Sequence, residues 1–136
     1  MKAVSKPVQT FLARTIAGLE LGEYRRWQAP GYMPLVLERI GADLFSLAHY
    51  GEQNGDLMRD PDVVFWRGSD ERYYPVSFRN DYTGTDVTCV EFEAAADGTR
   101  RPVRLAVQRQ RDLASFCSTW YRNIREQDHE SFPQPT

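Results

Sequence analysis

The 136-residue chain has no long apolar run and contains only two cysteines and two histidines. A membrane-spanning helix needs about 20 consecutive apolar residues, and no segment of the sequence approaches that length. Residues 1–8 carry Lys2 and Lys6 but no apolar core of a signal peptide, so we expect a cytoplasmic protein with no membrane association. Cys89 and Cys117 lack the spacing of a metal-binding or redox pair and lie in apolar segments, which predicts buried, reduced thiols.

Common catalytic and nucleotide-binding motifs are also absent. The sequence has no glycine-rich phosphate loop, no nucleophile elbow and no HExxH zinc motif. Nucleophilic catalysis needs a Ser, Cys or Thr beside a base. A dyad of Cys89 or Cys117 with His49 is conceivable, but the apolar positions of both cysteines argue against it. We therefore expect no cofactor, and we favour a protein without enzymatic activity.

What the chain does have is the composition of a globular domain, with 41% hydrophobic, 26% charged and 12% aromatic residues. Its charge is unevenly distributed, because residues 1–29 and 98–136 each carry a net charge of +3, whereas residues 30–97 carry −8. Almost all the basic residues are arginines, which suit carboxylate and phosphate recognition but also follow from a GC-rich gene alone.

Two segments have the periodicity of amphipathic helices. Near the start, Ser5 is the expected N-cap of a helix whose apolar positions are Val8, Phe11, Leu12 and Ile16. Towards the end, one apolar stripe predicts a helix over about residues 109–127, formed by Leu113, Phe116, Cys117, Trp120 and Ile124.

Alternating patterns between these helices predict strands. They occur near residues 35–38, 44–50, 63–67 and 73–79. A further hairpin is expected from the alternating residues 87–92 and 103–107, with its turn at Asp97 and Gly98. The order of elements predicts an α+β fold, an antiparallel β-meander of about four to six strands flanked by an N-terminal and a C-terminal helix packed on one face. We expect a single domain over residues 1–127 and a flexible C-terminal tail over residues 128–136.

The densest polar cluster is the acidic cluster 49–62, whose candidate binding residues are His49, Glu52, Asn54, Asp56, Asp60 and Asp62. Hard divalent cations prefer carboxylate and amide oxygens, so one hypothesis is a divalent-metal-dependent enzyme with His49 as its base. An EF-hand is excluded, because Leu57 stands where that motif requires glycine. We favour a connection between strands in which Asn54 and Gly55 supply the positive φ of a turn.

A binding surface is the other candidate. Arg122 and Arg125 lie off the apolar stripe of the C-terminal helix, and tyrosines such as Tyr32 add to a surplus of aromatic residues. Exposed Tyr, Trp and Arg are enriched at protein interfaces. A nucleic-acid-binding module is the alternative, but the pI of about 5.7 is low for one. We therefore favour a protein partner.

Three segments resemble a small bacterial family, a domain of unknown function encoded on conjugative and other mobile elements. They are Gly31–Val36, residues 49–62 and Trp120–Arg125, and the likeness covers most of residues 31–127. An insertion around residues 94–104 departs from the family pattern and would place the second hairpin outside its core. The resemblance brings no activity or catalytic residues, and it implies an accessory role such as host-defence evasion or support of DNA transfer.

Overall fold

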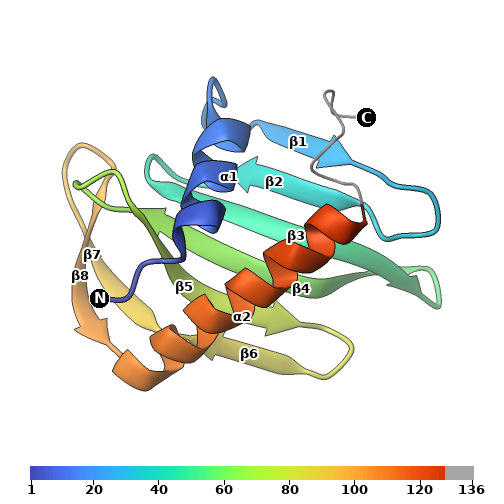
Figure 1. Ribbon diagram of the computed structural model, residues 1–136. Helices are drawn as coiled ribbons and strands as arrows, with labels where there is room; N and C mark the ends of the chain where they lie inside the picture. Colours follow the sequence, from blue (N-terminus) through green and yellow to red (C-terminus); the bar gives the residue numbers. More distant parts are fainter. Residues whose placement is uncertain (128–136) are drawn as a thin grey trace.

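The computed structural model describes residues 1–127, so the tail expected at residues 128–136 lies outside the described residues. Figure 1 shows helices at both ends of the described chain and strands between them. Within residues 1–127, neither helix combines the length and apolarity needed to cross a membrane. In chain order the elements are α1 (Lys6–Ile16), β1 (Tyr24–Trp27), β2 (Leu35–Arg39), β3 (Leu44–Gln53), β4 (Asp56–Arg67), β5 (Tyr73–Asn80), β6 (Thr85–Thr88), β7 (Val90–Ala94), β8 (Arg100–Leu105) and α2 (Val107–Glu126).

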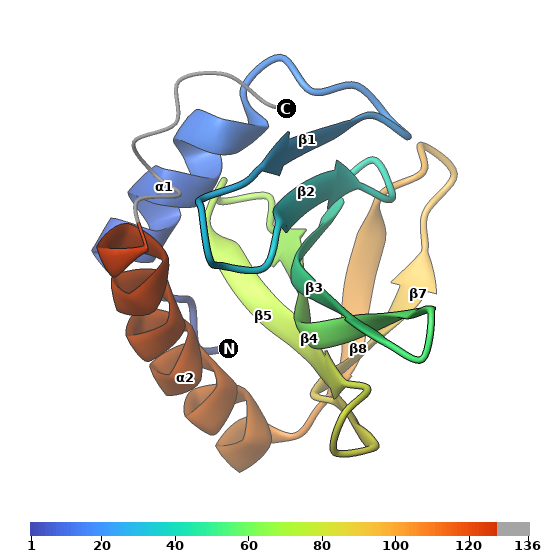
Figure 2. The same cartoon turned by 90° about the vertical axis from the view of Figure 1, so that its right-hand side faces the viewer.

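The strands form an antiparallel meander of six, in the order β1-β2-β3-β4-β5-β6, and a separate pair, β7-β8. Viewed from the side in Figure 2, α1 and α2 cover one face of the meander, while β7 and β8 lie on its other side. We name these the helix face and the hairpin face. The predicted α+β class, with both helices on one face of an antiparallel sheet, is confirmed.

Both helices form where the apolar periodicity places them. Ser5 occupies the N-cap position of α1, with Pro7 in the first turn, although the Ser5 side chain makes no capping hydrogen bond. The four apolar residues predicted for this helix are all buried. Helix α2 begins two residues before the predicted start, and its stripe is buried except at Phe116, which keeps 37% of its surface exposed.

The helix face contains most of the apolar core. Successive side chains of a strand point to opposite faces, and Phe45 of β3 and Phe65 of β4 are register partners on the helix face. Both are fully buried in one hydrophobic cluster that also includes Leu12 of α1 and Ile124 of α2. Cys89 and Cys117 belong to the same cluster, as predicted for reduced thiols.

The hairpin face is held by aromatic and polar contacts. The rings of Trp66 and Phe92 lie 5.5 Å apart, which joins β4 to β7. Asp43, only 5% exposed, accepts hydrogen bonds from the Trp66 indole at 2.9 Å, and from the Arg100 backbone and guanidinium at 2.7 Å each. One carboxylate therefore connects the start of β3 to the start of β8.

Two strand predictions need correction. The alternation over residues 87–92 belongs to two strands in different sheets, because Cys89 leaves the meander between β6 and β7. Its backbone N–H donates to Val76 at 2.7 Å, and its carbonyl accepts from Ala106 at 2.8 Å. Strand β1 was not predicted at all, since its four residues do not alternate between apolar and polar.

The predicted connection between strands with its turn at Asn54 and Gly55 is present, but the two strands are longer than the predicted ranges 44–50 and 63–67. Strands β3 and β4 run through residues 49–62 and leave only Asn54 and Gly55 as the turn. Their φ angles of 53° and 84° are those of the two-residue turn that suits a β-hairpin, so the predicted positive φ is confirmed. Apart from Asn54, the polar residues of this segment are therefore strand residues, and the turn and a bulge in β4 distribute their side chains over both faces.

Candidate binding cleft

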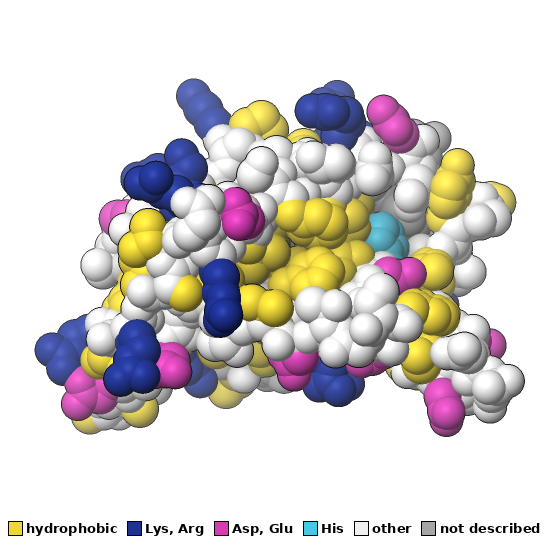
Figure 3. Space-filling view, turned by 90° about the horizontal axis from the view of Figure 1, so that it is seen from below, with side chains coloured by type: hydrophobic (Ala, Val, Ile, Leu, Met, Phe, Trp, Pro, Cys, Tyr) yellow, Lys and Arg dark blue, Asp and Glu magenta, His cyan; other side chains and the backbone are white. Residues whose placement is uncertain are grey.

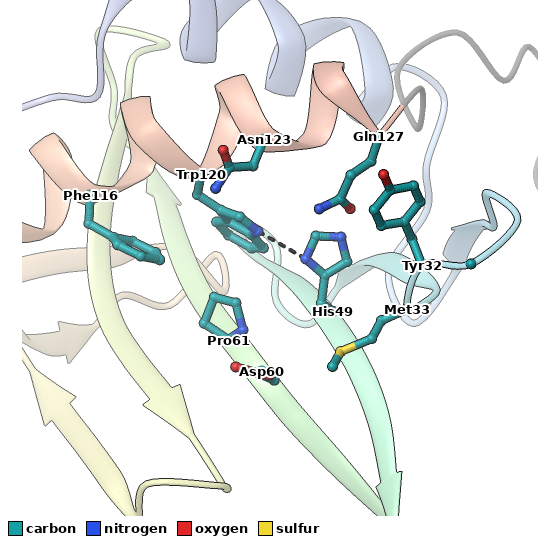
Figure 4. A pocket seen from close by; sticks show the side chains of 10 residues that line it. Tyr32, Met33, His49, Asp60, Pro61, Phe116, Trp120, Asn123 and Gln127 are labelled. Carbon is teal, nitrogen blue, oxygen red and sulfur yellow. Dashed lines mark hydrogen bonds between the residues drawn. The ribbon is translucent and has the colours of Figure 1, made fainter.

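A cleft of about 390 Å³ opens on the helix face between the C-terminal half of α2 and the middle of β3 and β4. Figure 4 shows that its lining comes from three places, namely α2, the β3-β4 pair and the loop before β2. Its lining residues are Gly31, Tyr32, Met33, His49, Asp60, Pro61, Phe116, Trp120, Asn123 and Gln127. The predicted site residues Tyr32, His49 and Asp60 are thus brought together.

A row of aromatic rings runs along the cleft and the neighbouring sheet. Phe78 of β5 meets Phe116 edge-on at 5.3 Å, Phe116 stacks against Trp120 at 6.1 Å, and Trp120 meets His49 at 5.7 Å. In Figure 3, hydrophobic side chains fill a hollow in the surface, and the histidine lies at one end of it. The wall of the cleft is therefore apolar, aromatic and continuous.

His49 is fixed in orientation by Trp120. The indole N–H of Trp120 donates to Nδ1 of His49 at 3.0 Å, and His49 is only 6% exposed. An indole nitrogen can only donate, so Nδ1 is the unprotonated nitrogen of the ring and Nε2 carries the proton of the neutral imidazole. The cleft wall therefore contains a neutral histidine whose ring cannot rotate without breaking this bond.

Asp60 and Pro61 enter the cleft through an irregularity in β4. The register runs from Ala48 opposite Asp62 to Tyr50 opposite Arg59, so His49 faces the extra residue of a bulge. Proline has no N–H to donate to a neighbouring strand, which makes a bulge a suitable place for it. The Asp60–Pro61 peptide bond is cis. The Asp60 carboxylate accepts a 2.7 Å hydrogen bond from the Asn80 side-chain amide.

The loop before β2 supplies the opposite wall. Gly31 has φ of +81°, a conformation that favours glycine, and it precedes Tyr32 at the mouth of the cleft. The Tyr32 backbone N–H donates to Ala29 at 3.1 Å, which closes a turn. The Tyr32 side chain remains 49% exposed, so its ring is accessible to a binding partner.

The other acidic-cluster residues lie elsewhere. Glu52, Asn54 and Asp56 are exposed at the tip of the β3-β4 hairpin. The ladder between β2 and β3 ends at His49, and that between β4 and β5 begins at Asp62, so this tip pairs only with itself. Among residues 1–127, no group of three or more His, Cys, Asp or Glu side chains is placed to hold a metal ion. The cluster does not assemble into one site.

Asp62 points to the hairpin face. Its carboxylate accepts a 2.7 Å hydrogen bond from the Ser46 hydroxyl. Burial raises the pKa of Asp62 and outweighs the opposing effects of the Ser46 hydrogen bond and of Arg59 and Arg79. Burial, with the nearby Asp62 charge, also raises the pKa of Tyr50. These two residues form a polar pair on the face opposite the cleft.

Arg122 and Arg125 are not cleft residues. They project from the exposed side of α2, and the Arg125 guanidinium lies over the Tyr121 ring at 5.9 Å. Tyr121 in turn packs against Phe11 of α1. The predicted arginine surface and the aromatic cleft are therefore separate features of the same helix.

Sequence reasoning missed part of the cleft, and a signal for it was present. The α2 side of the cleft consists of Phe116, Trp120, Asn123 and Gln127. Their spacing of four, three and four residues places them in one row on the helix. Phe116 and Trp120 were assigned to the core, and the two amides that continue the row were not considered.

Comparison with protein-family models gives a match over residues 6–130, to a family described as Domain of unknown function (DUF6908). The chain belongs to this family. The DUF6908 match includes α1, which the resemblance based on residues 31–127 did not cover, and it spans the β7-β8 hairpin. No curated protein and no solved structure matches the chain.

The cleft brings together the segments that suggested a family resemblance. Tyr32 and Met33 come from the first segment, His49 and Asp60 from the second, and Trp120 and Asn123 from the third, and all six line the cleft of this DUF6908 domain.

Proposed function

We propose that this DUF6908 protein is a non-enzymatic accessory protein that binds a protein partner in the cleft between α2, the β3-β4 pair and the Tyr32 loop. One observation carries the proposal, which is the row of aromatic rings along an open cleft. Binding energy at protein interfaces concentrates in aromatic anchors that fill such hollows. Tyr32 and Phe116 are accessible there, while Trp120 and His49 are fixed behind them.

The state of the two cysteines supports a function without nucleophilic catalysis. Burial raises the pKa of Cys117, with a smaller contribution from the nearby Cys89, and burial also raises the pKa of Cys89. The thiolate is the reactive form of cysteine, so neither side chain is an activated nucleophile. The cleft instead offers the stacked rings of Phe116 and Trp120 and a His49 ring held by a hydrogen bond, which suit recognition.

The biological setting is part of the same proposal. The resemblance on which it rests is to a bacterial family encoded on conjugative and other mobile elements, and we place the protein in the cytoplasm as an accessory factor of such an element. Its partner would then be a host or element-encoded protein met inside the cell.

The test begins with capture of partners from a bacterial host lysate on the immobilised full-length protein. Each captured protein is then purified, and its affinity is measured by calorimetry for the wild type and for Tyr32→Ala with Phe116→Ala. Removing two aromatic anchors should weaken binding by about tenfold or more. Tyr24→Ala is the matched control, since Tyr24 is an exposed tyrosine on β1, outside the cleft.

Three results would overturn the proposal. One is a partner that binds the double variant as tightly as the wild type. Another is sub-micromolar, steeply salt-dependent DNA binding that Arg122→Glu with Arg125→Glu abolishes, because release of counterions from phosphates produces that dependence. The third is calorimetric binding of Mg²⁺, Mn²⁺ or Ca²⁺ that Glu52→Ala with Asp56→Ala removes, which would favour the metal-dependent enzyme.

A further inference from the structure

The charge of the cleft restricts what it can receive. Among the described residues that line it, Asp60 is the only charged one, and no lysine or arginine is present. An anionic group in the cleft would meet this carboxylate without a cation to pair with. His49 adds no positive charge to the cleft, because its Nδ1 accepts the Trp120 hydrogen bond and its ring is neutral.

The surroundings extend the negative charge beyond the cleft. Besides Asp62, which points to the hairpin face, the β3-β4 hairpin that forms its floor carries three acidic side chains between residues 49 and 62 and one basic side chain, Arg59. The Arg59 guanidinium is itself paired with Asp81 at 3.2 Å. Exposed Glu52 and Asp56 at the hairpin tip therefore give this end of the molecule a negative field that attracts basic segments.

The aromatic lining suits a cation as well. A lysine ammonium or arginine guanidinium is attracted to the faces of aromatic rings, most strongly where water is excluded. Tyr32 and Phe116 present accessible rings on two sides of the cleft. Figure 4 shows the Asn123 and Gln127 side chains on the cleft side of α2, where an amide oxygen can accept from a cationic donor.

We infer that the cleft receives a lysine or arginine side chain from a basic segment of the protein partner. Its aliphatic stem lies along the aromatic row, and its charged end pairs with Asp60. This inference rests on the proposed function and adds the chemistry of the partner to it.

The test uses short acetylated and amidated peptides that share one neutral sequence and differ only at a central residue. That residue is lysine, arginine, norleucine or glutamate, and norleucine retains the lysine stem without the ammonium group. Binding is followed by the shift of the Trp120 indole N–H resonance in ¹H–¹⁵N spectra of the full-length protein. The resonance is assigned by its loss in Trp120→Phe.

We expect the lysine and arginine peptides to bind about tenfold more tightly than the norleucine peptide, and the glutamate peptide to bind least. In Asp60→Asn, the preference for lysine over norleucine should fall to about twofold or less. This variant removes the charge while its amide oxygen can still accept from Asn80, so the β4 bulge is preserved. Asp86→Asn, on an exposed carboxylate of β6 outside the cleft, is the matched control and should retain the full preference.

Equal binding of the lysine and norleucine peptides would overturn this inference while leaving the proposed protein-binding function intact. The same conclusion would follow if no peptide shifted the Trp120 resonance, or if Asp60→Asn kept the preference for lysine. The proposed function fails separately, through a purified partner that is indifferent to loss of Tyr32 and Phe116.

Discussion

On the helix face of the sheet, Phe45 and Phe65 pack in an apolar cluster under both helices, whereas on the hairpin face the neighbouring Ser46 and Trp66 form hydrogen bonds with carboxylates. The same two strands supply both faces, because alternate side chains point in opposite directions. The helix face is therefore stabilised mainly by burial of apolar area, and the hairpin face by aromatic packing together with a few polar contacts of defined geometry. A test of this difference must change adjacent residues of one strand.

The largest effect is expected on the helix face. Phe65→Ala should lower the free energy of unfolding by about 3–5 kcal/mol, because it leaves a cavity in a packed core. Val64→Ala, the adjacent residue on the hairpin face, should cost only about 1 kcal/mol. Urea denaturation of both variants measures the difference, and equal losses would show that the two faces contribute alike.

A smaller effect is expected at the polar junction of the hairpin face. Asp43→Asn keeps the shape of the side chain but removes the charge that pairs with Arg100, so we expect a loss of about 2–3 kcal/mol. Amide exchange should accelerate in β7 and β8 more than in β3 and β4. The control is Glu93→Gln, which breaks only an exposed pair with Arg101 and should cost about 0–1 kcal/mol. Uniform acceleration of exchange across both sheets would contradict a local anchoring role.

The tip of the β3-β4 hairpin belongs to neither face, so substitutions there should have small effects on stability. Gly55→Val forces a β-branched residue to a φ of 84° and should cost about 1–2 kcal/mol. Asn54→Gly places a tolerant residue at the other positive φ and should change stability by about 0.5 kcal/mol or less. Thermal unfolding distinguishes the two, and full stability of Gly55→Val would mean that the turn adopts another conformation.

The pH dependence of stability should have opposite signs for two carboxylates, Asp62 of β4 and Asp81 of the β5-β6 turn. Burial holds the pKa of Asp62 in the folded state above its value in the unfolded chain. The folded state therefore binds more protons between these two pKa values, and the contribution of Asp62 to stability is lost as pH rises through its folded pKa. Asp81 has the opposite sign: hydrogen bonds from Arg59 lower its pKa, and its contribution is lost as pH falls through the folded value. Asp62→Asn should therefore be more stable than wild type at neutral pH, with the difference shrinking towards acid.

The unfolding free energies of Asp62→Asn and Asp81→Asn, measured from acid to neutral pH, check both signs. Asp81→Asn should be less stable than wild type at neutral pH. A destabilised Asp62→Asn at neutral pH would mean that its hydrogen bond with Ser46 outweighs the cost of burial.

The two helices could be predicted from the sequence because the periodicity of apolar residues along a helix is a local property. The buried positions of α1 follow directly from the spacing of Val8, Phe11, Leu12 and Ile16. Strand β1 carries no such signal, since Tyr24 is exposed at the sheet edge and only Trp27 is buried. The crossing at Cys89 was also hidden, because alternation continues through residue 89 while the pairing partner changes from β5 to β8.

The cleft, too, was only partly predictable from local sequence patterns. His49 and Asp60 were singled out by residue type, and tertiary structure brings them together with Tyr32. Asp62 was grouped with them because it is close in sequence, and simple alternation would even place Asp60 and Asp62 on one face. The bulge at Asp60 and Pro61 shifts the alternation, so Asp60 borders the cleft while Asp62 points to the other face. Phe116 was placed in the core because helical spacing does not reveal which part of an apolar stripe the sheet leaves uncovered.

The self-paired tip of the β3-β4 hairpin has a practical consequence for experiments on this protein. Its two strands project beyond β2 and β5 and end at Asn54 and Gly55. Exposed turns of this kind accept inserted segments, and each doubling of a flexible loop costs only about 0.6 kcal/mol. A fluorescent label inserted between Asn54 and Gly55 would therefore extend from the strands that form the cleft floor without lying in the cleft itself.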